Sequence, residues 1–169
     1  MCTLGSICEI KLGGRIPKEN LSDNGTIPVI GGGVSPLGYA TKANMSGNQI
    51  TISQHGTAGY VAWQSEPFCA YHKCYTILPS SKINSKYLFY VLKAKQEHLY
   101  YLVTPSPIPS LSSRVLSRVL IPVPPIEVQE KIVSVLDRFL ALNDELAKIQ
   151  DYKGEQKEYY MKELLNFEN

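Results

Sequence analysis

Short apolar runs separated by turn-forming residues fill the first three quarters of the chain. Glycine, proline, asparagine and serine recur between the runs, most densely at the triple glycine of residues 31–33. The runs are rich in β-branched and aromatic residues, which predicts strands over Ile7–Leu12, Ile27–Ile30, Gln49–Ser53, Tyr60–Trp63 and Cys74–Leu78. Strands this short and this regularly spaced predict a twisted, mostly antiparallel sheet or a partial barrel.

The apolar pattern changes to a helical period over Asn84–Leu102, where large apolar residues recur every three or four positions. This predicts a helix that packs on the sheet, capped at its start by Asn84 or Ser85. Its three lysines are expected to face solvent: Lys86, Lys93 and Lys95.

Three prolines lie within the segment from Thr104 to Ser110 and predict a stiff, extended loop. Ser110 or Ser112 can then cap a short helical turn that runs to Val115. An edge strand is predicted at residues 119–123, since Pro122 has no N–H to donate to a neighbouring strand.

Pro124 and Pro125 end this part of the chain, and neither proline nor glycine occurs from Ile126 to Gln150. Apolar residues there alternate three- and four-residue steps, which is a coiled-coil seam: Ile132, Val135, Phe139, Leu142, Leu146 and Ile149. A helix of about 40 residues would be about 60 Å long at ~1.5 Å per residue. We expect it to pair with another chain; the alternative is a helix that folds back at Gly154.

The predicted fold class is therefore α+β, with a sheet domain at residues 1–124 and a long coiled-coil helix at residues 125–169. Length allows one ordinary domain with a core, and 44% hydrophobic against 19% charged residues indicates a globular protein. Charge divides along the same boundary. Residues 1–125 hold eleven basic and five acidic residues, or +6, and residues 126–169 hold six and ten, or −4, which together give the net +2. A basic domain suits a polyanionic partner, and an acidic helix suits a protein partner or solvent.

No apolar run approaches the ~18 residues needed to cross a bilayer, and the start of the chain does not resemble a secretory signal. A cytoplasmic protein with no membrane partner is the expectation. Four cysteines are present, and Cys69, His72 and Cys74 have a spacing that suggests a metal cluster. A second ligand pair is lacking, so we expect no metal and interpret the cysteines as small buried thiols in a strand.

Several segments, in order, resemble one family. The residues that carry the resemblance are Gly13–Pro17, Ile27–Gly33, Gly38-Tyr39, Ile50–Gly59, Tyr87–Leu92, Thr104–Leu111 and, most characteristically, Ile121–Phe139 with its Pro124-Pro125 and Gln129. Together they are similar to the specificity subunits of type I restriction-modification systems. Pro105 departs from the family's pattern in its loop. The full subunit in this family has two recognition domains and two long helices, so this chain resembles half of one.

The resemblance implies a non-catalytic chain that reads one half of a bipartite target in double-stranded DNA. Modification (methyltransferase) subunits would use S-adenosylmethionine, restriction subunits would cleave, and this chain would bind no cofactor itself. The chain would act as a homodimer or with a second half subunit, through its helix. Consistent with this, no nucleophile and base have persuasive spacing in the sequence.

Glycine-rich turns let the backbone approach DNA, and polar side chains beside them can reach the edges of bases. The candidates for this role are Gly32, Gly33, Ser35, Tyr39, Gln54, His55, Thr57, His72, Lys73, Thr104 and Ser106. Basic residues are expected to hold the phosphates: Lys11, Arg15, Lys18, Lys42 and Arg114. Gln54 can pair with adenine through two hydrogen bonds. For Gly31–Gly33 and His55 a purely structural role stays open, and Trp63 is interpreted as core.

Three alternatives remain at this point. The chain could be the recognition module of a type II methyltransferase–nuclease. It could be a protein-interaction adaptor, with a sheet domain that binds protein and a helix that oligomerises. It could also be a metal- or thiol-dependent enzyme built on Cys69, His72 and Cys74.

Overall fold

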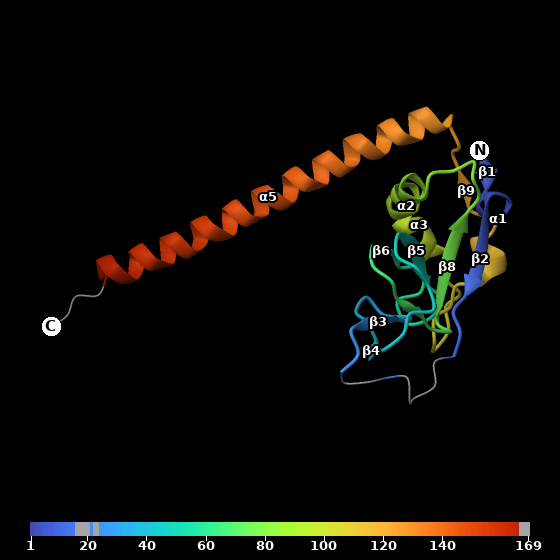
Figure 1. The fold of residues 1–169 in the computed structure, drawn as a ribbon, viewed down its shortest axis with the longest axis horizontal. Helices are drawn as coiled ribbons and strands as arrows, with labels where there is room; N and C mark the ends of the chain where they lie inside the picture. The colour runs from blue at the N-terminus through green and yellow to red at the C-terminus, as the bar shows by residue number, and fades with distance from the viewer. Residues whose placement is uncertain (16–20, 22–23, 166–169) are drawn as a thin grey trace. The chain divides into compact units, whose positions relative to one another are not determined.

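The structure is a computed structural model that describes residues 1–15, 21 and 24–165 of the 169. The chain forms two compact units, Met1–Glu130 and the part from Lys131 onward. The first unit contains every strand of the described chain together with four short helices, and the second consists of helix (Figure 1). Each unit is described by itself below.

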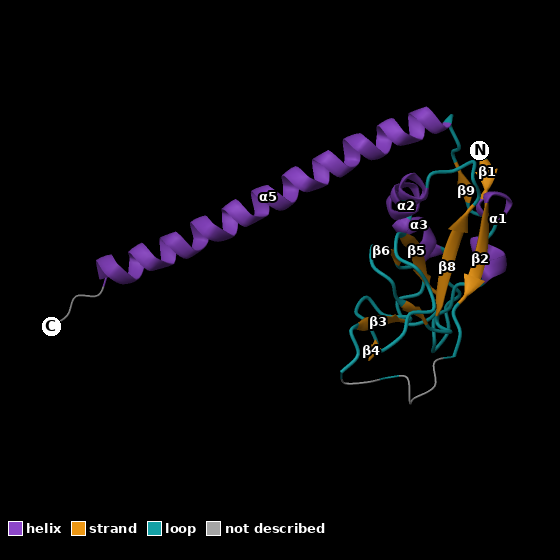
Figure 2. Ribbon diagram, in the orientation of Figure 1, coloured by secondary structure: helices purple, strands orange, loops and turns teal. Residues whose placement is uncertain are grey.

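A four-stranded antiparallel sheet, in the order β2-β8-β5-β6, is the frame of the first unit (Figure 2). Its strands are β2 (Cys8–Leu12), β5 (Gln49–Ser53), β6 (Val61–Gln64) and β8 (Cys74–Pro79). The two central strands, β5 and β8, are buried over most of their length, as a sheet covered on both faces requires. The core is built from their side chains, from apolar residues of the helices, and from Phe68, Leu111 and Ile121 of other segments. Its fully buried members are Leu4, Ile50, Ile52, Phe68, Ile77, Leu88, Leu92, Leu99, Leu111, Leu116 and Ile121.

Two smaller sheets complete the unit. In one, β3 (Ile27–Ile30) lies between β4 (Tyr39–Ala40) and β7 (Cys69–Ala70), antiparallel to the former and parallel to the latter. In the other, β1 (Cys2–Thr3) pairs with β9 (Leu120–Ile121). Figure 1 shows β3 and β4 at the end of this unit opposite to β1 and β9. The expectation of antiparallel sheet is confirmed, in the form of separate open sheets.

Six strands were predicted, and five of them exist with bounds within one residue. Ile7 is the exception at a boundary: it belongs to a short helix, α1 (Leu4–Ile7), because its side chain is buried with Leu4. The strand expected at residues 119–123 is shorter and pairs with the first residues of the chain. That pairing of distant segments has no local signal in the sequence.

The helix expected over residues 84–102 is two helices, α2 (Ser85–Ala94) and α3 (Gln96–Tyr101). Asn84 caps α2, and its side chain accepts hydrogen bonds from the backbone of Lys86 and Tyr87. The helical conformation is interrupted at Lys95, where ψ is 14°. The break lets Gln96 turn to the edge strand β6, where its side chain accepts from the N–H of Val61 and donates to the carbonyl of Gly59. The fourth short helix, α4 (Ser113–Leu116), is capped by Ser112.

Lys93 of α2 is exposed, as expected, and Lys86 is half-buried, but both also contact the sheet. The ammonium of Lys93 donates to the carbonyl of Val61 over 3.0 Å and lies 4.6 Å from the ring centre of Tyr60. Lys86 lies 4.6 Å above the ring of Trp63, which is half-buried rather than in the core. Aromatic faces attract cations, so the long lysine stems cover the edge strand while the charges stay near water.

Helix α5 (Ile126–Leu165) is 40 residues long and continues through Gly154, so the helix does not fold back there. An isolated glycine costs a helix about 1 kcal/mol, which the helix formers on both sides offset. Its first turn belongs to the first unit. The fully buried Gln129 accepts from the N–H of Asn84 at 2.8 Å and donates to the carbonyls of Pro124 and Lys82. Compact packing therefore extends to Glu130, beyond the prolines at which the sequence analysis divided the chain.

Candidate nucleic-acid interface

Loops from distant parts of the chain meet at one end of the four-stranded sheet. The last residue of β2, Leu12, lies opposite Tyr75, and the last residue of β5, Ser53, lies opposite Cys74. The turns that follow β2 and β5 and the turn that precedes β8 therefore leave the sheet at the same end. We call this set of segments the loop end; it comprises residues 13–15, 30–33, 54–57, 71–73 and 104–111.

The triple glycine and the turn after β5 are in backbone contact. The carbonyl of Gly32 accepts two hydrogen bonds from Thr57, one from its N–H and one from its hydroxyl, both at 2.8 Å. A Cβ atom on Gly32 would lie 2.1 Å from the carbonyl oxygen of His55, far inside van der Waals distance. Gly56 has φ of +74°, which a side chain would disfavour. Both glycines are thus required by the turn itself, which supports the structural role that was left open for residues 31–33.

Gln54 joins the proline loop to the sheet. Its backbone carbonyl accepts from the N–H of Leu111 at 3.0 Å, and its side-chain amide donates to the hydroxyl of Tyr75 at 2.9 Å. Tyr75 in turn donates to the carbonyl of Leu111 at 3.1 Å. The proline loop closes on itself through the N–H of Thr104 and the carbonyl of Ser110. An adenine edge would therefore meet the other amide hydrogen of Gln54 and its Oε1.

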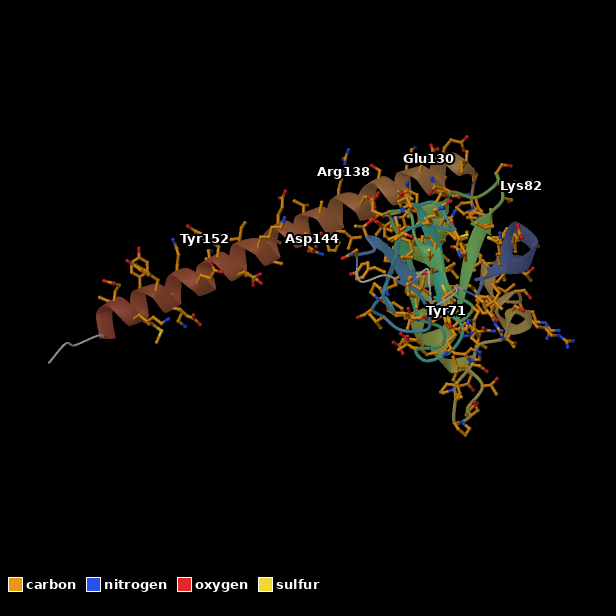
Figure 3. All side chains as sticks on the ribbon, turned by 60° about the horizontal axis from the view of Figure 1, so that its bottom comes forward. Tyr71, Lys82, Glu130, Arg138, Asp144 and Tyr152 are labelled. Carbon is orange, nitrogen blue, oxygen red and sulfur yellow. The ribbon has the colours of Figure 1, made fainter. Side chains whose placement is uncertain are left out.

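Basic groups gather at the loop end. Arg15, His55 and Lys73 are close enough to His72 to lower its pKa, although burial of the His72 ring is the larger cause of the lowered pKa. The ring of His72 contacts that of Tyr71, with 4.0 Å between centres; Tyr71 is labelled in Figure 3. No aspartate or glutamate occurs in the five segments of the loop end. Nothing in these segments neutralises the positive charge, so the loop end attracts anions.

The two histidines have a further property in common. Within the described part of the chain, the Nδ1 atoms of His55 and His72 are buried and meet no hydrogen-bond partner. A buried N–H without an acceptor is costly, and so is a buried charge. For His72, with its lowered pKa, a neutral ring that carries its proton on Nε2 satisfies both constraints. Such a ring donates one hydrogen bond, which suits the acceptors on a guanine edge or on a phosphate.

The loop end thus unites many of the predicted DNA contacts: Arg15, Gly32, Gly33, Gln54, His55, Thr57, His72, Lys73, Thr104 and Ser106. Ser106 uses its hydroxyl within the loop, where it donates to the carbonyl of Ile108.

The other predicted contacts lie elsewhere or outside the description. Ser35 and Tyr39 are exposed around the turn from β3 to β4, and Lys42 is exposed just beyond it. Lys11 is exposed on β2, opposite Thr76. Arg114 lines a shallow hollow with Cys8 and Ile10, beside β2 rather than among the converging loops. Lys18 lies outside the residues that the structure describes.

Sequence reasoning missed Tyr71 and Tyr75, which orient His72 and Gln54. Tyr75 is buried in a predicted strand, whereas Tyr71 is half-buried just after β7, which was not predicted. In neither case does the sequence show which side chain the ring will contact. Gln129 was noted only as part of a motif. Its full burial, which the motif did not reveal, explains why an amide is needed at that position.

Two of the four cysteines behave as buried thiols, as expected, whereas Cys2 and Cys8 are half-buried. Cys69 and Cys74 are buried in strands, and the thiol of Cys69 donates to the carbonyl of Lys42. Burial raises the pKa of Cys74 to about 12, which opposes the thiolate that metal binding or nucleophilic attack requires. In residues 1–15, 21 and 24–165 no group of three or more His, Cys, Asp or Glu is placed to hold a metal ion. The described helices also include none that is both long and apolar enough to span a membrane.

The predicted seam of α5 presents unburied apolar side chains. Each of its six members is exposed, from 37% at Ile132 to 66% at Val135, and Phe139 is exposed to 60%. Arg138, Asp144 and Tyr152, labelled in Figure 3, show how charged and aromatic side chains surround the same helix. A row of large exposed apolar groups at heptad spacing is typical of a helix that pairs with another.

Comparison with known proteins decides the family. The family model described as the type I restriction modification DNA specificity domain matches residues 1–153. The chain belongs to this family. As a type I specificity domain it also resembles curated proteins of Mycoplasma pneumoniae. It is 30% identical over 171 residues to the type I restriction enzyme MpnII specificity subunit, covering 95% of this chain and 51% of that protein. It is 30% identical to a putative type I specificity subunit of the same organism, covering 95% of this chain and 71% of that protein.

Solved structures of specificity subunits share the fold. The type I restriction-modification S subunit from Mycoplasma genitalium superposes with a TM-score of 0.79 at 23% identity, over 99% of this chain and 46% of that one. The HsdS subunit from Thermoanaerobacter tengcongensis superposes with a TM-score of 0.68 at 21% identity, over 88% and 39%. This specificity domain spans about half the length of several of the proteins it matches.

Proposed function

We propose that this specificity domain reads one half of a bipartite target in double-stranded DNA, and that a second copy reads the other half. The observation that carries the proposal is the loop end. There the sheet holds five polar, glycine- and proline-rich segments together with Arg15, His55, His72 and Lys73, and without an acidic residue. Positive charge supplies sequence-independent affinity for phosphates, and rigid polar loops supply base contacts.

Within the loop end the two roles fall to different residues. Arg15 and Lys73 are exposed and charged, as phosphate contacts require. Gln54, His72 and Thr57 are held by neighbouring rings or backbone, and a side chain fixed in this way can discriminate between base edges. Lys11, Lys42 and Arg114 are further candidates for phosphate contact at the flanks.

The charges beside the seam favour an antiparallel pair of α5 helices. If Phe139 of one copy faces Leu142 of the other, then Val135 faces Leu146 and Ile132 faces Ile149. This arrangement brings Arg138 opposite Glu145 of the other copy, twice by symmetry. A parallel pair would instead place Arg138 near Asn143 and Glu145 near Gln150, with no opposite charges. An antiparallel pair sets two recognition units apart, as two half-sites separated by a spacer require.

The chain is proposed to act without chemistry of its own. Modification subunits would methylate the DNA with S-adenosylmethionine, and restriction subunits would cleave it. Support comes from family membership and from the fold shared with a chain of a structure described as the complex assembly and conformational transition of the type I R-M system, with a TM-score of 0.78 at 19% identity.

The test of DNA reading is selection of duplexes from a randomised library by the purified chain. We expect enrichment of a split palindrome, because two identical copies read two identical half-sites. Arg15→Ala should weaken binding to every sequence and lower the salt slope, whereas Gln54→Ala should weaken mainly the selected sequence, by about 1–3 kcal/mol. If the selected duplexes share no sequence after selection, the proposal is refuted.

The test of dimerisation is the mass of the chain in solution. Phe139→Glu places a charge in the centre of the seam and should give monomers in sedimentation experiments. Ser134→Glu is the matched control, since this exposed residue lies on the same helix outside the seam. Equal masses for the two variants would contradict pairing through the seam.

A further inference from the structure

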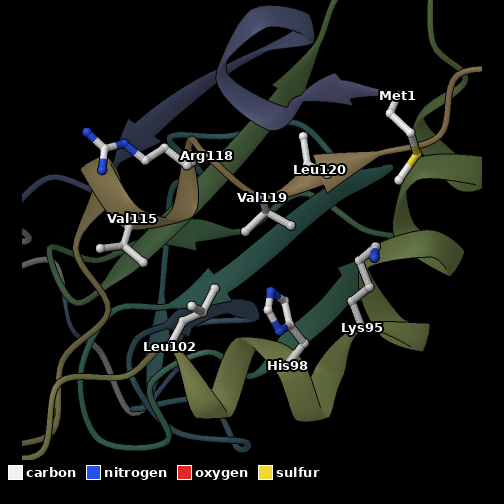
Figure 4. Close-up of a pocket in the computed structure, with 8 residues that line it drawn as sticks. All are labelled: Met1, Lys95, His98, Leu102, Val115, Arg118, Val119 and Leu120. Carbon is white, nitrogen blue, oxygen red and sulfur yellow. The ribbon is translucent and has the colours of Figure 1, made fainter.

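The first unit has a groove whose place in the fold is distinct from the loop end. Its volume is about 530 Å³, and Figure 4 shows its two walls. One wall is formed by Lys95, His98 and Leu102 of the α2–α3 segment, which follow one another at helical spacing. The opposite wall is formed by Val115, Arg118, Val119 and Leu120, and Met1 lies at one end.

The chemistry of the groove is that of a peptide-binding surface. Leu102, Val115 and Val119 offer apolar contact, while Lys95 and Arg118 supply positive charge. Among the residues that the structure describes, none that lines the groove is acidic. An occupant with apolar or aromatic side chains beside acidic ones would complement it. The apolar lining favours such a segment over the uniformly charged backbone of DNA.

The distal part of α5, from Tyr152 to Leu164, has this chemistry. It exposes Tyr152, Tyr159, Tyr160, Met161 and Leu164 to between 49% and 73%. Three glutamates and three lysines alternate with them: Glu155, Glu158 and Glu163, and Lys153, Lys157 and Lys162. At helical spacing, Glu155 and Glu163 share the face of the three tyrosines, and that face is the one that complements a basic groove. The heptad seam does not account for these residues, because the next two seam positions after Ile149 are Lys153 and Gln156.

The antiparallel register leaves most of this part of the helix, from Gln156 onward, without a helical partner. When Ile132 faces Ile149 of the second copy, Glu127 faces Gly154. From Gln156 onward the second copy's helix therefore extends past the start of α5 at Ile126. The overhang of about ten residues is about 15 Å long. The first turn of α5 is part of the first unit, so the overhang begins beside that unit of the other copy.

The groove is within reach of this overhang. Leu120, in its wall, precedes Ile126 by six positions, a separation of at most about 20 Å in an extended chain. The connection is also held in place: the hydroxyl of Tyr87 donates to the carbonyl of Pro122, and Gln129 donates to that of Pro124.

We propose that the distal segment of α5, Tyr152–Leu164, docks in the groove between α3 and the α4–β9 segment of a second copy. The inference rests on the proposed dimer. It assigns to the dimer a second pair of contacts, at the ends of the paired helices, that ties each helix to the recognition unit of the other copy.

The test is photo-crosslinking in the full-length dimer. A benzophenone amino acid replaces Val115, which is half-buried in the groove, and the labelled chain is mixed with an isotopically heavy copy. We expect crosslinks between light and heavy chains that map to residues 152–165. A benzophenone at the exposed Thr41, away from the groove, is the control and should give none with that segment. Crosslinks from position 115 that map elsewhere, or none between the two copies, would overturn the proposal.

A charge reversal gives an independent measurement. Arg118→Glu should raise the dissociation constant of the dimer about tenfold, as loss of a complementary charge at an interface predicts. Lys148→Glu makes the same change in net charge at an exposed position outside the groove and outside the seam, and should leave the constant within about twofold of the unmodified chain. Equal constants for the two variants would argue against docking.

The two proposals fail differently. If the unmodified chain sediments as a monomer, or if Phe139→Glu leaves the dimer intact, pairing through the seam is wrong. If Phe139→Glu separates the copies but position 115 gives no crosslink to residues 152–165, pairing stands and only docking in the groove is wrong.

Discussion

Gly32 offers a direct test of how the loop end is built. In Gly32→Ala the new Cβ would lie 2.1 Å from the carbonyl oxygen of His55, where ordinary contact needs more than 3 Å. The two turns must therefore separate by about 1 Å or more. The carbonyl of Gly32 would then lose both hydrogen bonds from Thr57, each 2.8 Å long.

The size of the effect follows from these contacts. Each lost hydrogen bond costs about 1 kcal/mol, and a buried carbonyl left without a partner adds about 1–2 kcal/mol. Alanine restricts the unfolded chain and offsets less than about 1 kcal/mol of this. We expect Gly32→Ala to lower the free energy of unfolding by about 2–3 kcal/mol, together with a loss of preference for the selected duplex.

The neighbouring glycine is a matched control. A Cβ on Gly33 would meet Ser35 O as its nearest atom, at 3.4 Å, which is an ordinary contact. Gly33→Ala should change the free energy of unfolding by less than about 1 kcal/mol, in either direction. Urea denaturation of both variants, followed by circular dichroism, measures the difference. The free energies of unfolding of the two variants would have to differ by more than about 0.5 kcal/mol, which is the size of ordinary surface effects. A smaller difference would show that the contact between the two turns does not stabilise the protein as these distances predict.

Two further changes test other parts of the structure. Gln129→Ala should lower the free energy of unfolding by about 2–4 kcal/mol in the same denaturation assay, because the N–H of Asn84 and the carbonyls of Pro124 and Lys82 lose their partner in a fully buried site. Glu130→Ala, at an exposed position, is the control and should not lower it. Similar losses for the two variants would refute the role of Gln129. The pKa of His72 is lowered below its ordinary 6.5, chiefly by burial and then by Lys73, Arg15 and His55. The unfolded chain therefore binds the proton more readily, so stability is retained above pH 6.5 and falls as the pH drops below it. His72→Gln should make thermal unfolding less sensitive to pH between 7 and 5, and an unchanged pH profile would contradict this origin.

The local pattern along the chain was sufficient to predict the five main strands, the cap at Asn84 and the length of α5. Alternating or clustered β-branched residues favour a strand regardless of which other strands it will pair with. Heptad spacing likewise predicts a helical seam from neighbouring positions alone. The break at Lys95 was not predictable, since it depends on Gln96 meeting the backbone of Val61 and Gly59 far away in the sequence. The hydrogen bond from the exposed Lys93 to Val61 was not predictable for the same reason, since Val61 becomes its neighbour only in the folded sheet.

The candidate site shows the same division. Glycine-rich turns with nearby polar residues led to the prediction that these segments contact DNA. The fold brings Arg15, Gln54, His55, Thr57, His72 and Lys73 together, and their contact with DNA stays a prediction. Arg114 was grouped with them by charge alone, yet it lies beside β2. Charge is a property of a residue, whereas membership of a site depends on which strand ends are neighbours.

By itself the sequence determined the main strands and helices, the family and the presence of an unpaired apolar seam, because each of these depends on the spacing of nearby residues or on the order of motifs. Tertiary structure decided the rest. Antiparallel pairing of β2, β8 and β5 brings the turns of residues 13–15, 54–57 and 71–73 to one end of the sheet, and folding buries Gln129. It also creates the groove between α3 and the α4–β9 segment. These features arise from contacts between residues tens of positions apart, and no local pattern encodes which distant segments will meet.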